Sequence, residues 1–244
     1  MNFETVKWNP DTYRKFQTYL WSLQDIKYRD FHSKLIQEAD SLIGIRTPIL
    51  KEIAKTIAKN QPYEFLKVIK HDTYEEKVLH GLLIGYMKIS FDECILLLQD
   101  FLSYNTNWAI NDITCANLKI WKKHLEEGFV VIKRYLKDKN LWTIRFGLVL
   151  LLDFYINDTY IDSVLALSST ISGKKYYVGM ANAWLLSICY VHYPKKTMEL
   201  LKKNILDDFT QRRAIQKIIE SNRVSGKEKE QVRKLRAHLG ESLI

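Results

Sequence analysis

The segment from Asn105 to Ile113 places an aromatic residue and an acid inside an otherwise apolar run. Trp108 and Asp112 stand four residues apart, so in a helix they share one face. A carboxylate beside a Trp ring is suited to stabilise a cation, because charge and cation–π attraction act together. A structural interpretation stays open, in which Trp108 belongs to the core and Asp112 pairs with a basic neighbour such as Arg145.

Two later segments carry residues of the same kinds. The run from Asn140 to Arg145 repeats the pattern with a cation, Arg145, at the position that Asn111 holds in the first segment. The run from Met180 to Trp184 adds a second Trp. Their structural interpretations are an ion pair for Arg145 and a core position for Trp184.

Helices are the elements expected to position these residues, because helical patterns follow one another and no alternating run bounded by hairpin turns competes. Thr47 as N-cap, with Pro48 in the first helical position, indicates a helix that runs to about Lys59. The other expected helices cover residues 11–23, 28–39, 63–70, 74–89, 91–102, 107–121, 125–137, 141–155, 161–171, 176–193, 194–203, 210–221 and 227–239.

A repeat of 34 residues links these helices. Steps of that length from Tyr74 reach Trp108, Trp142, Tyr176 and Thr210, each just inside the start of an expected helix that a second helix follows. Stacked helix pairs of this length form an α-solenoid, a superhelix with one concave face. We therefore predict an all-α protein with a single domain over residues 1–244. The register puts the four candidate residues on neighbouring helices of one layer.

Composition agrees with a helical fold and excludes other classes. The chain has 244 residues, 47% of them hydrophobic, with only 9 Gly and 4 Pro, which argues against a sandwich, a barrel or a Gly-rich nucleotide-binding fold. The apolar stretches near residues 146–152 and 180–191 are too short or too interrupted for a membrane span. Residues 1–4 lack a signal-peptide pattern. Three scattered Cys residues, Cys94, Cys115 and Cys189, indicate buried thiols. We expect a cytoplasmic protein.

The charge is positive and uneven. Lys and Arg number 37 against 28 Asp and Glu, a net charge of +9, and residues 195–244 alone hold 13 basic and 7 acidic side chains. A basic C-terminal fifth is typical of a polyanion partner, although a solvated helix face has the same composition.

The ordered set of segments resembles the AlkD-type DNA alkylation repair glycosylases, whose fold is a solenoid of HEAT-like repeats. The similar stretches are Gly44–Pro48, Asn107–Asp112, Asn140–Arg145, Ala181–Trp184 and Gln211–Ile215, with compatible spacing from about residue 44 to 220. The resemblance implies a monomer that binds duplex DNA on a concave basic face, without a metal or an organic cofactor.

The resemblance assigns roles to single residues. The family's catalytic Asp falls on Asp112 and its two active-site Trp residues on Trp108 and Trp184, while Arg145 takes the place of the Arg near the scissile nucleotide.

Four further residues are candidates for contacts with DNA. Arg46 and Thr47 match residues that lie against the duplex, and the helix start at Thr47 offers N–H groups to a phosphate. Arg212 and Arg213 are candidate backbone contacts, and a solvated helix start is the alternative for both.

Two positions depart from the family pattern. Asn107 stands where relatives often carry an aromatic residue, a change that bears on substrate range. Ser187 stands where the family can place an Arg, which removes one phosphate contact.

The implied reaction is the release of cationic purines alkylated at N3 or N7. Such a base leaves as a neutral molecule, so no general acid is needed, and one carboxylate can stabilise the sugar cation and position water. The resemblance implies contact through the deoxyribose rather than a tight base pocket. Two rival functions stay open: a non-catalytic AlkD-like protein that binds unusual DNA structures, and a HEAT-type protein–protein scaffold.

Overall fold

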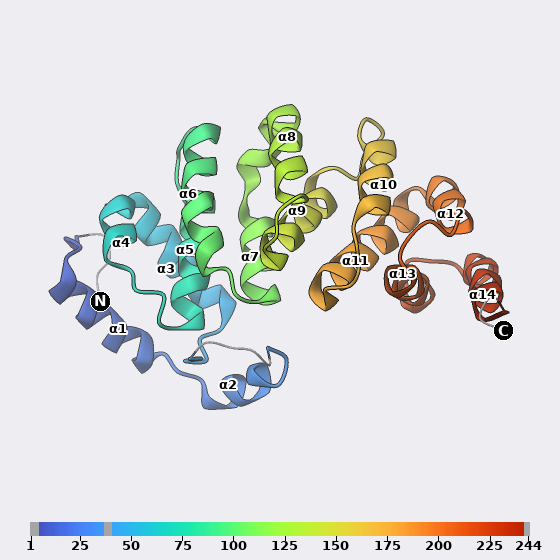
Figure 1. Ribbon diagram of the computed structural model, residues 1–244. Coiled ribbons are helices and arrows are strands. Elements are labelled where there is room, and N and C mark those ends of the chain that lie inside the picture. The colour runs from blue at the N-terminus through green and yellow to red at the C-terminus, as the bar shows by residue number, and fades with distance from the viewer. Residues whose placement is uncertain (1–4, 37–40, 242–244) are drawn as a thin grey trace. The chain divides into compact units, whose positions relative to one another are not determined.

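The computed structural model describes residues 5–36 and 41–241. Over these residues the chain forms fourteen α-helices, one 3-10 helix and a single isolated β-bridge between Ser41 and Thr73, so the predicted all-α class is confirmed (Figure 1). The helices are α1 (Pro10–Ser22), α2 (Ile26–Ser33), α3 (Thr47–Lys59), α4 (Pro62–Val68), α5 (Tyr74–Tyr86), α6 (Phe91–Tyr104), α7 (Trp108–Asn117), η1 (Lys119–Lys123), α8 (Leu125–Tyr135), α9 (Leu141–Phe154), α10 (Ile161–Thr170), α11 (Tyr176–His192), α12 (Pro194–Lys202), α13 (Asp208–Glu220) and α14 (Gly226–Glu241).

Most boundaries agree with the sequence prediction, and three differ. Helix α5 ends at Tyr86 because Met87 is extended. The expected helix 107–121 ends at Asn117, whose side-chain amide donates to the Leu82 carbonyl at 2.9 Å, and η1 follows it. Helix α2 ends at Ser33, and residues 37–39 of the expected helix lie outside the described ones.

The chain divides into two compact units, residues 1–124 and 125–244, so the prediction of one domain stays a prediction. In the first unit, α3 packs on α5 and α5 on α7, while α4 packs on α3 and α6 on α5. This is a two-layer stack of helix pairs. At its N-terminal side the rings of Trp8, Phe16 and Phe65 meet edge to face, with centroids 4.8–5.4 Å apart.

The second unit repeats the same plan. Helices α9, α11 and α13 pack in a row, and α8, α10, α12 and α14 form a second layer on them. The core of this row includes fully buried Phe146, Leu185 and Ile215, one from each helix. Each unit thus contains helix pairs stacked as in an α-solenoid.

The 34-residue register is visible in the helix starts. Tyr74, Trp108 and Tyr176 are the first residues of α5, α7 and α11, Trp142 is the second of α9, and Thr210 is the third of α13. The predicted repeat is therefore confirmed as a repeat of helices.

Helices α5 and α7 approach closely through glycines. A Cβ atom at Gly81 would lie 1.9 Å from the Thr114 Oγ1 atom, and one at Gly85 would lie 2.2 Å from the Asn117 Nδ2 atom. Only glycine fits at these two positions, so α7 rests directly on the backbone of α5.

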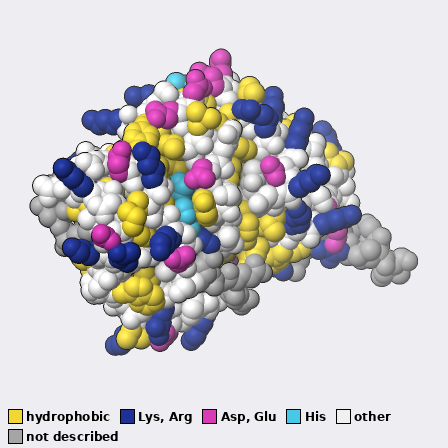
Figure 2. Space-filling view, turned by 60° about the vertical axis from the view of Figure 1, so that its left-hand side comes forward, with side chains coloured by type: hydrophobic (Ala, Val, Ile, Leu, Met, Phe, Trp, Pro, Cys, Tyr) yellow, Lys and Arg dark blue, Asp and Glu magenta, His cyan; other side chains and the backbone are white. Residues whose placement is uncertain are grey.

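The three cysteines are buried and reduced, as predicted. None of the described helices is long and apolar enough to cross a membrane. Figure 2 shows Lys and Arg side chains spread over one face with acidic side chains between them. A concave basic face stays a prediction.

Candidate active site

Helix α7 begins with a side-chain cap. The backbone of Asn107 is extended, and its Oδ1 atom accepts hydrogen bonds from the N–H groups of Ala109 at 2.9 Å and Ile110 at 3.1 Å. This cap fixes Trp108 as the first helical residue. Asn107, a departure from the family pattern, therefore has a structural role here.

The faces of α7 differ in burial. Ala109, Ile110, Asn111 and Thr114 are among its buried residues. Trp108 and Asp112 are half-buried, and Ala116 is exposed, at a spacing of four residues. Trp108 and Asp112 thus lie on an accessible stripe of a helix that is otherwise core, and the small Ala116 leaves space beside them.

Trp108 is anchored through its indole nitrogen. The Nε1–H group donates to the carbonyl of Leu35, which follows α2, at 3.3 Å. This bond joins the start of α7 to a segment 73 residues earlier in the chain. Trp108 is therefore held in place although its surface is accessible.

A buried cation lies beside the start of α7. Lys77 on α5 is 7% exposed, and its Nζ atom donates to the Thr106 Oγ1 atom at 3.3 Å. Sequence reasoning did not select Lys77 as a site residue. The signal was present, because Lys77 holds the same register position as Arg145, two steps of 34 residues further on.

Arg145 lies on α9 in the second unit and is buried. Its Nη1 atom donates to the carbonyl of Tyr177, the second residue of α11, at 2.9 Å. The rings of Trp142 and Tyr177 are 4.9 Å apart at their centroids. Arg145 therefore joins α9 to the first turn of α11 through a backbone carbonyl.

Trp184 lies on the accessible side of α11. It is half-buried, as are Tyr177, Met180 and Ile188 at helical spacing, whereas Asn182 faces the core and bonds Ser168. Ser187, the second departure, is buried and its hydroxyl donates to the Trp184 carbonyl at 2.7 Å. A core position for Trp184 is therefore not what the structure shows.

The four candidate residues form two pairs. Trp108 and Asp112 share one face of α7 in the first unit, and Arg145 and Trp184 lie on the adjacent helices α9 and α11 in the second. A single cleft lined by all four stays a prediction.

The start of α3 corrects one sequence inference. The N-cap is Arg46 and not Thr47, Thr47 is already helical, and no side chain caps the helix. The N–H of Ile49 donates to the Arg46 carbonyl at 2.9 Å, so the backbone itself satisfies part of the first turn. Fewer N–H groups are left there for a phosphate than the sequence indicated.

Arg46 is positioned by its own contacts. Its guanidinium bonds the Asp25 carboxylate at 2.9 Å and lies over the Tyr28 ring, 5.0 Å from the centroid. The N–H of Tyr28 and the Arg46 guanidinium lower the pKa of Asp25. Arg46 is exposed, and its contact with a DNA duplex stays a prediction.

Arg212 and Arg213 are exposed in the second turn of α13. The Nε atom of Arg212 bonds Asp208 at 2.8 Å, and Arg213 lies over the Phe209 ring at 5.6 Å. Both therefore have local partners, and their guanidinium groups remain open to solvent.

A family model described as DNA alkylation repair enzyme matches residues 16–218, which is most of the chain. The chain belongs to this family. The family membership confirms the resemblance seen in the ordered segments and gives the protein a role in DNA alkylation repair. A search of curated proteins finds no match.

Proposed function

We propose that the protein is a monofunctional DNA glycosylase that excises cationic purines alkylated at N3 or N7 from duplex DNA in base excision repair. The observation that carries the proposal is the accessible stripe of Trp108 and Asp112 on α7, in a chain of the DNA alkylation repair family. Most of the remaining surface of α7 is buried, so Asp112 lies on the side of the helix that solvent reaches.

The proposed reaction needs one carboxylate. An alkylated purine that carries a positive charge leaves as a neutral base, so its departure requires no acid. Positive charge then develops on the deoxyribose, and Asp112 stabilises it and positions the attacking water. The product is DNA with an abasic site and a free base.

The remaining candidate residues support this step. Trp108 and Trp184 present aromatic surface to the cationic nucleotide, an attraction of about 0.5–2 kcal/mol each. Arg145 contributes positive charge toward the neighbouring phosphate. The proposed contacts with the DNA backbone are made by four further residues: Arg46, Thr47, Arg212 and Arg213. The protein acts as a cytoplasmic monomer without a cofactor.

The test compares wild type with Asp112→Asn in single-turnover release of 7-methylguanine from methylated duplex DNA at saturating enzyme. Loss of one electrostatic stabiliser lowers the rate by about 10²-fold or more. DNA affinity stays nearly unchanged, because a carboxylate near phosphates repels more than it binds. Asp92→Asn, an exposed acid on α6, is the matched control and keeps the wild-type rate.

Equal rates for wild type and Asp112→Asn would show that Asp112 is a structural residue and would overturn the proposal. Release of uncharged lesions is expected to be low for both proteins, since neither supplies an acid for a poor leaving group.

A further inference from the structure

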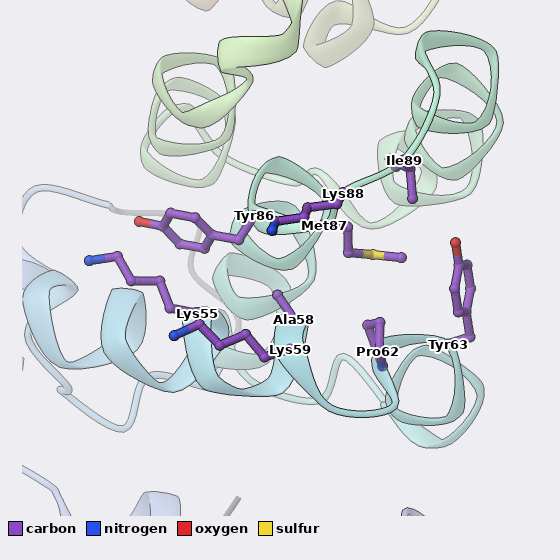
Figure 3. A pocket seen from close by; sticks show the side chains of 9 residues that line it. All are labelled: Lys55, Ala58, Lys59, Pro62, Tyr63, Tyr86, Met87, Lys88 and Ile89. Carbon is purple, nitrogen blue, oxygen red and sulfur yellow. The ribbon is translucent and has the colours of Figure 1, made fainter. Parts of the chain in front are cut away.

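A second site lies in the first unit, away from Trp108 and Asp112. A pocket of about 460 Å³ opens where α3 and α5 end and α4 begins (Figure 3). It is lined by the end of α3, the start of α4 and residues 86–89 at the end of α5 and beyond it, whereas Trp108 and Asp112 belong to the first half of α7. Its volume lies in the range of small-molecule sites.

One end of the pocket is cationic. Lys55 and Lys59 come from α3 and Lys88 from the turn after α5, and Figure 3 shows the three chains extending on the same side as the Tyr86 ring. The Nζ atom of Lys55 forms an ion pair with the Oε1 atom of Glu52 at 2.7 Å. Lys59 and Lys88 are exposed, and neither pairs with an acid among the described residues. Two positive charges are therefore open to an anion.

The other end is apolar and flat. Figure 3 shows the Met87 side chain pointing toward the Tyr63 ring, with Pro62 next to them. The Tyr63 hydroxyl donates to the Oε1 atom of Glu93 at 2.5 Å, which orients the ring. A thioether and an aromatic ring facing each other favour a planar ligand between them.

We propose that this pocket binds a nucleotide, with the base at the apolar end and the phosphate on Lys59 and Lys88. A bare phosphate would contact only the lysines, and an uncharged base would contact only the apolar end. A nucleotide uses both ends, and stacking on aromatic surface with a lysine-bound phosphate is how proteins hold unpaired nucleotides. The ligand comes either from free nucleotide or from an unpaired nucleotide at a DNA end. The site goes beyond the proposed base release and does not depend on it.

Calorimetric titration of the full chain with AMP, adenosine and inorganic phosphate tests whether one ligand uses both the apolar and the cationic end of the pocket. If free nucleotide is the source, AMP binds at least about 10-fold more tightly than either half-ligand. The double variant Lys59→Gln/Lys88→Gln and the filling variant Ala58→Phe each weaken AMP binding about 10-fold or more. The control Lys122→Gln/Lys123→Gln, two exposed lysines of η1, leaves it unchanged.

A second arm compares a blunt duplex with one that carries a single unpaired 5′ adenosine. If a DNA end is the source, the overhang duplex binds more tightly and both pocket variants remove the difference. If neither AMP binding nor the overhang preference is weakened by the pocket variants relative to the control, the proposal is overturned. Base release from methylated duplex DNA by the pocket variants is measured in parallel and stays at the wild-type rate. A failure of the nucleotide-site proposal is therefore distinguishable from a failure of the role proposed for Asp112.

Discussion

Glu75 on α5 and Asp112 on α7 are carboxylates on adjacent helices of one unit, and their surroundings are opposite. Glu75 is fully buried, and its oxygens accept the N–H groups of Ile43 at 3.0 Å, Gly44 at 2.7 Å and Ile45 at 3.1 Å. Asp112 is half-buried on the accessible stripe of its helix. Glu75 therefore holds the backbone segment that leads into α3. Asp112 lies on a surface that solvent reaches.

The two carboxylates therefore differ in burial and in their access to solvent. Burial raises the pKa of Glu75, and the three N–H donors oppose that rise. A carboxylate in such a position has used its acceptors on the backbone. The role proposed for Asp112 requires instead that a cation can approach its carboxylate.

Removal of the buried acid Glu75 is expected to have the largest effect. Glu75→Ala leaves three N–H groups without their acceptor and is expected to lower the free energy of unfolding by at least about 3 kcal/mol. Asp112→Asn is expected to lower it by less than about 1 kcal/mol. Urea denaturation followed by circular dichroism measures both. Similar losses for the two variants would remove the distinction.

The contact between α5 and α7 gives the next effect. Gly81→Ala forces a methyl group against Thr114 and is expected to cost about 1–3 kcal/mol of unfolding free energy. It also displaces α7, so the rate of base release falls. Gly226→Ala is the control, because its Cβ would meet nothing within 4 Å. A Gly81→Ala protein as stable as the control would contradict the close packing.

Two histidines, the half-buried His71 before α5 and the buried His80 within it, make the stability of this unit depend on pH. The Nε2 atom of His71 lies 2.8 Å from the Nδ1 atom of His80, and burial lowers the pKa of His71 to about 4 and that of His80 to about 3. Because both values lie below that of an unfolded His, the unfolded chain binds protons first as the pH falls. The stability that this pair contributes is therefore present above pH about 6.5 and is lost progressively toward pH about 3.

The expected loss between pH 6.5 and 5 is on the order of 1–2 kcal/mol of unfolding free energy, since His71 is partly solvated. His71→Asn, which tolerates the positive φ of 62° at this position, is expected to reduce that slope. Denaturation midpoints measured at several pH values check this, and a wild-type midpoint independent of pH would be the contrary result.

The smallest effect concerns cations rather than acids. Arg145 is buried against α11, whereas Arg212 and Arg213 are exposed. Duplex binding is expected to weaken steeply with salt and to show little sequence preference, and each of Arg212→Gln and Arg213→Gln is expected to reduce the salt slope by about 1. Fluorescence anisotropy at several salt concentrations measures it. Affinity that does not change with salt would favour the scaffold function.

Sequence patterns predicted the helices and their register well, because these depend on local periodicity and on caps such as Asn107 and Asn140. They also placed Trp108 and Asp112 on one face, since a spacing of four residues is a local property. The wrong assignment of Thr47 as N-cap arose because Arg46 is held outside the helix by Asp25 and Tyr28, two contacts more than 15 residues away.

Other features depend on contacts between distant segments. The bonds from residues 43–45 to Glu75, the His71–His80 pair and the Arg145–Tyr177 bond join residues that no local pattern relates. The pocket at the ends of α3 and α5 is of the same kind, because Lys59 and Lys88 come from different helix pairs. Such features require the packing of the helices and not only their existence.

The burial of the three cysteines bears on survival during chemical stress. Reagents that alkylate DNA also attack thiolates. Burial raises the pKa of Cys94 and Cys189 to about 12, so both thiols stay protonated at pH 7. Cys115 is fully buried as well. A protein of alkylation repair folded in this way keeps its cysteine thiols out of reach of the electrophiles whose damage its family repairs.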